Sequence, residues 1–295
     1  MCLEEIPTTF SQSVPSTELY DFVDLNFARR LETAETLTPA HIRALQRFAP
    51  EATSELIGGG RAVFGGRRYP SNQIVGLGLY GPVSLADLEQ VEDFYHSRGV
   101  PCQIVVSPLA DRSLLDLLAP RRYRISEFNS VLIKRLDPSK LIEPADGITV
   151  ERVTTDTAQL WDRVISRGFA EFGPLPENLI ATFATMPDSL NFLARVNGEA
   201  AGGGMGTVLR EARIAALFGT ATVREFRRRG VQTALINRRL WDAAQHECEY
   251  AVVSTLPGSA SQRNMERRGF RLAYTKLVMV RTWPEVGPHE PDDGH

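Results

Sequence analysis

The stretch Arg227-Arg228-Arg229-Gly230-Val231-Gln232-Thr233 has the clearest chemical meaning in this sequence. An expected strand, residues 213–222, precedes it, and an expected helix from about Gly230 to His246 follows it. The first N–H groups of a helix have no acceptor within the helix, and the helix dipole favours an anion beside them. Gly230 has no Cβ that would hold a ligand away from the backbone. The stretch therefore predicts a phosphate-binding loop, although a basic, solvated helix end would use the same residues.

The elements around the loop favour the phosphate site. Their expected order is strand, strand, strand, loop, helix, strand, helix, strand. They span residues 192–196, 200–209, 213–222, 227–233, 230–246, 250–254, 259–268 and a last strand through 278–280. Asn197-Gly198, between the first two strands, is typical of a type I′ hairpin turn. The apolar run 250–254 indicates a buried strand.

This order resembles the GNAT N-acyltransferase superfamily. The loop fits the superfamily's acyl-CoA pyrophosphate signature Arg-x-x-Gly-x-Gly/Ala, except that Gln232 stands where a small residue is usual. Gly269-Phe270, after the last helix, is a second shared feature. The resemblance covers about residues 148–283 and implies an acyltransferase that uses acetyl-CoA as cosubstrate and needs no metal.

The chain also resembles itself at an offset of 147 residues. Val105-Val106-Ser107 matches Val252-Val253-Ser254, and Phe94 matches Trp241. We therefore expect an α/β fold with a mixed (α+β) sheet, made of two tandem GNAT-like units. The expected division is a degenerate unit at 1–145, a catalytic unit at 146–283 and a disordered tail at 284–295. The polar segment 137–147 is the expected linker.

The first unit lacks the phosphate loop. An expected strand at 74–79 leads through Tyr80-Gly81-Pro82-Val83-Ser84 to a helix at about 86–96 without any arginine, and Pro82 offers no N–H. This arrangement resembles tandem GNAT enzymes such as mycothiol synthase, in which the C-terminal unit carries catalysis.

The resemblance implies further cofactor contacts. In the superfamily the pantetheine arm lies along the strand before the loop, which corresponds here to Ala221, Thr222 and Val223. A bulge or splay of that strand would direct a backbone N–H at the thioester carbonyl and stabilise the oxyanion. Asn264 is expected either to bond the pantetheine or to face solvent. Arg238 and Arg239, on the polar side of the helix, are expected to be solvated.

The acid and the base are harder to assign. Many members place a general-acid tyrosine four residues before the Gly-Phe pair, where this chain has Met265. Tyr274 on the next strand is a candidate substitute, although a core tyrosine would fit the same position. Glu171 is the candidate base, in a loop where the superfamily builds its acceptor pocket, and the alternative is a surface carboxylate.

Composition limits the other classes of function. A net charge of −3 gives no reason to expect nucleic acid as a partner. The sequence has no run of about 18 apolar residues, so we expect no membrane span. Three cysteines without metal-type spacing favour a reducing cytoplasm. We expect a cytoplasmic monomer or homodimer.

The predicted function is acetyl transfer from acetyl-CoA to a primary amine of a small molecule or a protein, by direct attack. The alternatives are an O-acyltransferase, a user of a longer acyl-CoA, and a CoA-binding or sensing protein without turnover. Met265 at the expected acid position favours the last of these.

Overall fold

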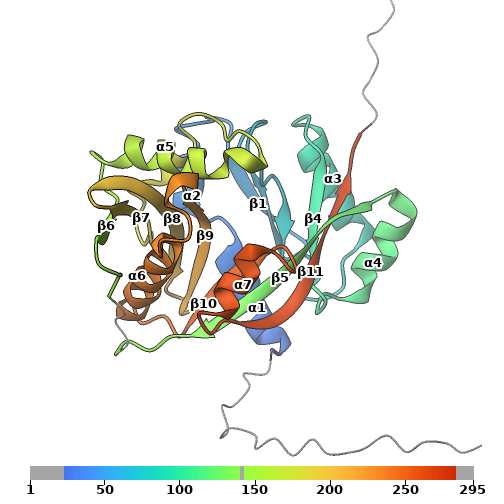
Figure 1. The fold of residues 1–295 in the computed structure, drawn as a ribbon. Coiled ribbons are helices and arrows are strands. Elements are labelled where there is room, and N and C mark those ends of the chain that lie inside the picture. Colours follow the sequence, from blue (N-terminus) through green and yellow to red (C-terminus); the bar gives the residue numbers. More distant parts are fainter. Residues whose placement is uncertain (1–22, 140–142, 284–295) are drawn as a thin grey trace, which may run out of the picture.

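The computed structural model describes residues 23–139 and 143–283, which build one mixed sheet of eleven strands (Figure 1). The order of the strands across the sheet is β1-β2-β3-β4-β11-β5-β10-β9-β8-β7-β6. Their bounds are Thr53–Ile57 (β1), Gly60–Phe64 (β2), Ile74–Val75 (β3), Cys102–Val106 (β4), Arg124–Arg135 (β5), Ile148–Arg152 (β6), Phe192–Val196 (β7), Glu199–Leu209 (β8), Ile214–Thr222 (β9), Tyr250–Thr255 (β10) and Arg271–Arg281 (β11). The predicted tail and residues 140–142 of the predicted linker lie outside the described residues.

Helices cover both faces of the sheet. They are Leu25–Glu35 (α1), Pro39–Leu45 (α2), Leu85–His96 (α3), Arg112–Leu118 (α4), Ala158–Phe169 (α5), Val231–Gln245 (α6) and Ala260–Glu266 (α7). Along β10, Ala251 and Val253 share a core with α6, whereas Val252 between them packs with α1. Because side chains alternate along a strand, α1 and α6 lie on opposite faces. Within the described ranges, each helix is too short or too polar to cross a bilayer.

The second unit has the predicted order of elements. The turn between β7 and β8 is the predicted hairpin turn, with φ of 49° at Asn197 and 87° at Gly198. Strands β6 to β9 pair antiparallel, and β10 then joins β9 in the parallel direction. The predicted α/β fold with a mixed sheet is confirmed.

The first unit repeats the second at the predicted offset. Strand β4, helix α4 and strand β5 recur as β10, α7 and β11, and α3 recurs as α6. The predicted tandem organisation is therefore confirmed. One prediction was wrong: the strand expected at 74–79 is only Ile74–Val75. Gly76 and Gly78 have φ of 87° and 80°, which ends the extended backbone, and the Gly78 carbonyl accepts a hydrogen bond from the Asp111 N–H instead.

The two units exchange their last strands. Strand β5, from the first unit, pairs antiparallel with β10 from Ser130 to Arg135 and also with β11. Strand β11, from the second unit, lies between β5 and β4 and pairs with β4 from Leu277 to Arg281. Figure 1 shows the two long strands crossing the centre of the molecule. The expected boundary near residue 145 stays a prediction, because the shared sheet marks no division there.

We expect the second unit not to fold alone. A fragment of residues 146–295 leaves β10 without β5, and β11 without β4 and β5. Unpaired apolar strand edges promote aggregation. Size-exclusion chromatography should show a monodisperse full-length protein and an aggregated fragment. A monodisperse fragment with native circular dichroism would contradict the importance of the exchange.

Candidate functional site

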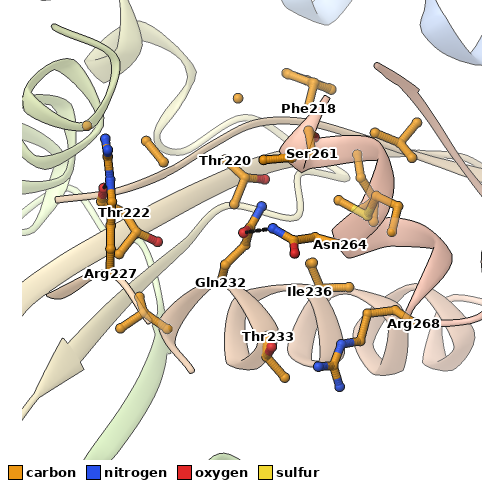
Figure 2. A pocket seen from close by; sticks show the side chains of 18 of the residues that line it. Phe218, Thr220, Thr222, Arg227, Gln232, Thr233, Ile236, Ser261, Asn264 and Arg268 are labelled. Atoms are coloured by element: carbon orange, nitrogen blue, oxygen red, sulfur yellow. Dashed lines mark hydrogen bonds between the residues drawn. The ribbon is translucent and has the colours of Figure 1, made fainter. Parts of the chain in front are cut away.

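The site lies where β9 and β10 separate. These parallel strands pair only at Ile214 with Tyr250, Ala215 with Ala251, and Ala216 with Val252. Beyond these pairs the strands diverge, and a cavity of about 820 Å³ opens between their carboxyl ends (Figure 2). Ligands of open α/β sheets commonly bind in a crevice at this end of the strands.

Most of the residues predicted to bind the cofactor line this cavity. They are Ala221, Thr222, Arg227, Arg228, Gly230, Val231, Gln232, Thr233 and Asn264. The candidate base Glu171 lines it as well. Val223, Arg229 and Tyr274 are not among the lining residues. The N–H of Val223 already donates to the carbonyl of Ala201.

A bulge shapes the β9 wall of the cavity. Gly203 of β8 lies opposite Ala221, but Met205 lies opposite Phe218, so β9 carries one extra residue between these pairs. Gly219 within the bulge has φ of 54°, in the left-handed region that glycine adopts at little cost. The predicted bulge therefore exists, but it precedes the expected residues 221–223. A glycine inside a strand was the sequence signal for it.

Arg239 supports the bulge from within the core. Its side chain is fully buried, which corrects the prediction that Arg239 is solvated. The guanidinium donates to the carbonyl of Met205 at 2.7 Å and to Oγ1 of Thr220 at 2.8 Å. A Cβ at residue 204 would lie 2.9 Å from the Arg239 Cζ, so glycine is required there. Burial lowers the pKa of Arg239 to about 9, which still leaves it charged at neutral pH.

The start of α6 forms one end of the cavity. Gly230 is the N-cap residue with φ of 88°, and no side chain caps this helix. A Cβ at Gly230 would meet only Ile148 at 3.5 Å, so the positive φ explains the glycine better than crowding does. The N–H groups of Val231, Gln232 and Thr233 belong to the first turn, where no intrahelical acceptor exists.

Four arginines line the cavity, and Figure 2 shows Arg227 and Arg268 on opposite sides of it. Arg227 and Arg228 come from the predicted loop, and Arg267 and Arg268 follow α7. The pair after α7 was missed from the sequence, because a basic end is usual for any helix. Arg229 lies instead with its guanidinium 5.6 Å from the centre of the Phe226 ring.

Two further polar groups reach into the cavity. Nδ2 of Asn264 donates to Oε1 of Gln232 at 2.6 Å, which joins α7 to α6 (Figure 2). Gln232, the residue that departs from the family signature, thus has a structural partner. The hydroxyl of Thr222 is buried and has no hydrogen-bond partner among the described residues. A buried hydroxyl without a partner is costly and is readily satisfied by a ligand.

The two candidate catalytic residues lie away from the bulge. Tyr274 packs with α1 on the other face of the sheet, and its hydroxyl donates to Oε1 of Glu32 at 2.7 Å. Burial, followed by the charge of Glu32, raises the pKa of Tyr274. Glu171 forms a salt bridge of 2.9 Å with Arg227. The core position of Tyr274 and the salt bridge of Glu171 match the alternatives given for these residues, and their roles as acid and base stay predictions.

Met265 lines the cavity and is 2% exposed, which leaves no proton donor at that position. Ser254 of β10 also lines the cavity and was not singled out from the sequence. Across residues 23–139 and 143–283, no cluster of His, Cys, Asp or Glu has the composition of a metal site.

Replacing Arg239 with methionine should destabilise the protein. The change removes the donors that satisfy Met205 and Thr220, and each buried acceptor left unsatisfied costs about 1–3 kcal/mol. Urea denaturation of Arg239→Met should show this loss in the free energy of unfolding. The matched control is Arg238→Met, because the adjacent Arg238 side chain is 38% exposed. Equal unfolding free energies for the two variants would contradict the supporting role of Arg239.

The comparisons with known proteins agree with this architecture. A model of the acetyltransferase (GNAT) family matches residues 158–270. The structure is similar to a GCN5-related N-acetyltransferase from Kribbella flavida, with a TM-score of 0.65 and 15% identity, over 88% of this chain and 97% of that one. It is also similar to a tandem GNAT protein from the clavulanic acid biosynthesis pathway, with a TM-score of 0.56 and 15% identity, over 87% of this chain and 93% of that one. Among curated proteins, no sequence matches this chain significantly.

The family match includes β9, the arginine loop, α6, β10 and α7, which are the elements that enclose the cavity. The two structural neighbours extend the likeness of fold to nearly all of the chain. The chain therefore carries an acetyltransferase domain of the GNAT family in its second unit and has the tandem GNAT fold.

Proposed function

We propose that the cavity binds acetyl-CoA and that the protein transfers the acetyl group to a primary amine. The observation that carries this proposal is the uncapped N-terminus of α6, with Arg227 and Arg228 just before it, at a cavity that two further arginines also line. Free N–H groups, the helix dipole and guanidinium groups all favour a phosphorylated ligand. The match of residues 158–270 to the acetyltransferase family supports acetyl-CoA as that ligand.

The residues present fit the proposed cosubstrate. Its pyrophosphate would lie against the first turn of α6, with Arg228 beside it. The pantetheine arm would then follow β9 past Thr222, which lines the cavity and whose buried hydroxyl has no partner among the described residues. The gap between β9 and β10 supplies the room that a paired sheet would not.

The bulge supplies the proposed chemistry at the thioester. Attack by an amine on the thioester carbon places negative charge on the carbonyl oxygen. Backbone N–H groups beside the Gly219 bulge would stabilise that charge, because they are already oriented before the reaction. Most of the rate enhancement then comes from positioning the amine and the thioester together. The acceptor in this proposal is an amine of a small molecule or of a protein, in the cytoplasm.

A CoA-binding protein without turnover is the second candidate. The buried Met265 favours it, because methionine cannot protonate the leaving thiolate. The two candidates differ in one measurable respect, which is the release of thiol when an amine is present.

The helix start of the first unit that corresponds to the start of α6 is already capped by side chains. Helix α3 takes the place of α6 there, and Ser84 and Asp87 form a capping box at its start. The Ser84 N–H donates to Asp87 Oδ2 at 2.9 Å, and the Asp87 N–H donates to Ser84 Oγ at 3.1 Å. The carboxylate of Asp87 thus occupies the position that an anionic ligand would need.

We expect one acetyl-CoA to bind per chain and thiol to be released when a primary amine is present. Isothermal titration calorimetry gives the stoichiometry, and a thiol reagent follows turnover over a panel of primary amines. Binding without thiol release for every amine would favour the non-catalytic candidate. Two equivalent binding sites would contradict the assignment of the site to the second unit alone.

Arg228→Glu should weaken acetyl-CoA binding at least tenfold, because it replaces a positive charge that lines the cavity with a negative one. Arg229→Glu is the matched control, since it makes the same change of charge one residue away, outside the cavity lining. Calorimetry at a fixed ionic strength compares the two dissociation constants. Equal losses of affinity would show a general effect of charge and argue against a phosphate site at Arg228.

A further inference from the structure

A chain of buried polar side chains lies behind the cavity and links α1 to β10 and β11. Ser254 Oγ donates to Glu35 Oε1 at 2.6 Å. Lys276 Nζ donates to the other carboxylate oxygen of Glu35 and, at 3.0 Å, to Oε2 of Glu32. The Tyr274 hydroxyl completes the chain by donating to Oε1 of Glu32. The side chains of Lys276, Glu32 and Glu35 are only 6%, 2% and 14% exposed.

Ser254 connects this network to the cavity. It lies on β10 two residues beyond Val252, the last residue of β10 that pairs with β9, and it lines the cavity together with Phe218 and Gly219 of the bulge. Both carboxylates come from α1 in the first unit, whereas Ser254 and the lysine come from the second. The first unit therefore contributes charged groups directly behind the wall of the second unit's cavity.

The opposite end of the network lies in the first unit. Glu32 borders a separate cavity of about 140 Å³, which Arg29 and Arg61 also line. Arg29 donates to the carbonyl of Leu79 and lies over the Tyr80 ring. The charged groups that face the network are thus Lys276 from β11 and these two arginines on the Glu32 side. At the Ser254 end, the partners of Glu35 among the described residues are the Ser254 hydroxyl and the ammonium group of Lys276.

The network has an excess of negative charge. It contains two carboxylates and one ammonium group. Burial lowers the pKa of Lys276, but Glu32 and Glu35 raise it by more, so the pKa lies above its ordinary value and the lysine stays charged. Buried ion pairs contribute little net stability because desolvation offsets their attraction. The Glu35 carboxylate is instead suited to accept a proton, because it is bonded to the hydroxyl of a cavity-lining serine, Ser254.

We propose that Ser254 and Glu35 form the proton-accepting pair of the acetyl transfer, with Lys276 and Glu32 holding the Glu35 carboxylate in place. This inference rests on the proposed function. It assigns the base to a carboxylate other than Glu171, which is paired with Arg227. It also gives the first unit a part in the chemistry.

The proposed step conserves atoms and charge. As the bond between the amine nitrogen and the acetyl carbon forms, the nitrogen loses a proton to Ser254 Oγ, and the Ser254 hydroxyl proton moves to Glu35 Oε1. The bond between carbon and sulfur then breaks, and its electron pair leaves on the CoA sulfur. The thiolate takes up the proton returned by the same path. Glu35 ends ionised, and the products are an amide and a thiol, with no need for a tyrosine at the position of Met265.

Glu35→Gln and Ser254→Ala in the full-length protein test the pair. Thiol release is measured over the panel of primary amines, and acetyl-CoA affinity is measured by calorimetry. We expect kcat to fall about 100-fold in each variant, the lower end of the range for general acid–base catalysis, while acetyl-CoA affinity is unchanged. The double variant should lose no more than the larger single loss, because the two groups act in series.

Glu249→Gln is the control. Glu249 forms a 2.8 Å salt bridge with Arg30, which lies on α1 like Glu35, but Glu249 does not line the cavity. The variant should keep wild-type turnover and wild-type affinity for acetyl-CoA. Full turnover in Glu35→Gln or Ser254→Ala overturns the pair and leaves the proposed function intact. An equal loss in Glu249→Gln, or a parallel loss of acetyl-CoA affinity in the test variants, also overturns it. A wild-type protein that releases no thiol with any amine overturns the proposed function, and the proton-accepting pair with it.

Discussion

Strands β9 and β10 pair over only three residues of each, and the rest of the site depends on their separation beyond Ala216 and Val252. A sheet that stayed closed there would bury the walls of the cavity against each other. Separation is costly because backbone groups on both strands lose their partners. On the other side of β9, at the bulge that it forms with β8, the buried guanidinium of Arg239 donates to a backbone carbonyl and a hydroxyl. The cavity is therefore a consequence of how one sheet is kept open.

Because β5 and β11 are exchanged, both units contribute to holding β10 in place beside the cavity. On the side away from β9, β10 is held by β5, which belongs to the first unit. Helix α1 covers the opposite face from α6 and brings Glu35 against Ser254. The start of α3 in the first unit is capped by its own side chains, yet that unit supplies both a strand and a helix to the second. A duplicated unit can lose its ligand and still be required when its elements complete the other copy.

The sequence was informative wherever local chemistry dictates local structure. The arginine loop, the Asn197-Gly198 turn and the order of strands and helices follow from residue types and short-range periodicity. The burial of Arg239 does not follow from these local features. An arginine on the polar side of a helix is expected to be solvated, and the space for its side chain comes from Gly204 on a facing strand. The sequence left Tyr274 open between an acid and a core residue for a related reason: which face of a strand meets the cavity depends on register with strands far away in the chain. Glu35 and Ser254 are 219 positions apart, and no local pattern relates them.

Helices α3 and α6 occupy equivalent places in the two units, but only the first turn of α3 is capped by side chains. In α3, Ser84 and Asp87 satisfy the free N–H groups, and a side-chain cap of this kind contributes about 1 kcal/mol. In α6, Gly230 provides no cap, and arginines are gathered near the positive end of the helix dipole, where cations are unfavourable. A chain shaped by stability alone would begin α6 as it begins α3. The uncapped, arginine-rich start of α6 fits the proposed anionic ligand, because a ligand that binds the folded state returns stability by mass action. The unit that kept this unfavourable terminus is the one whose strands separate, which places the anion site and the reaction space in the same half of the sheet.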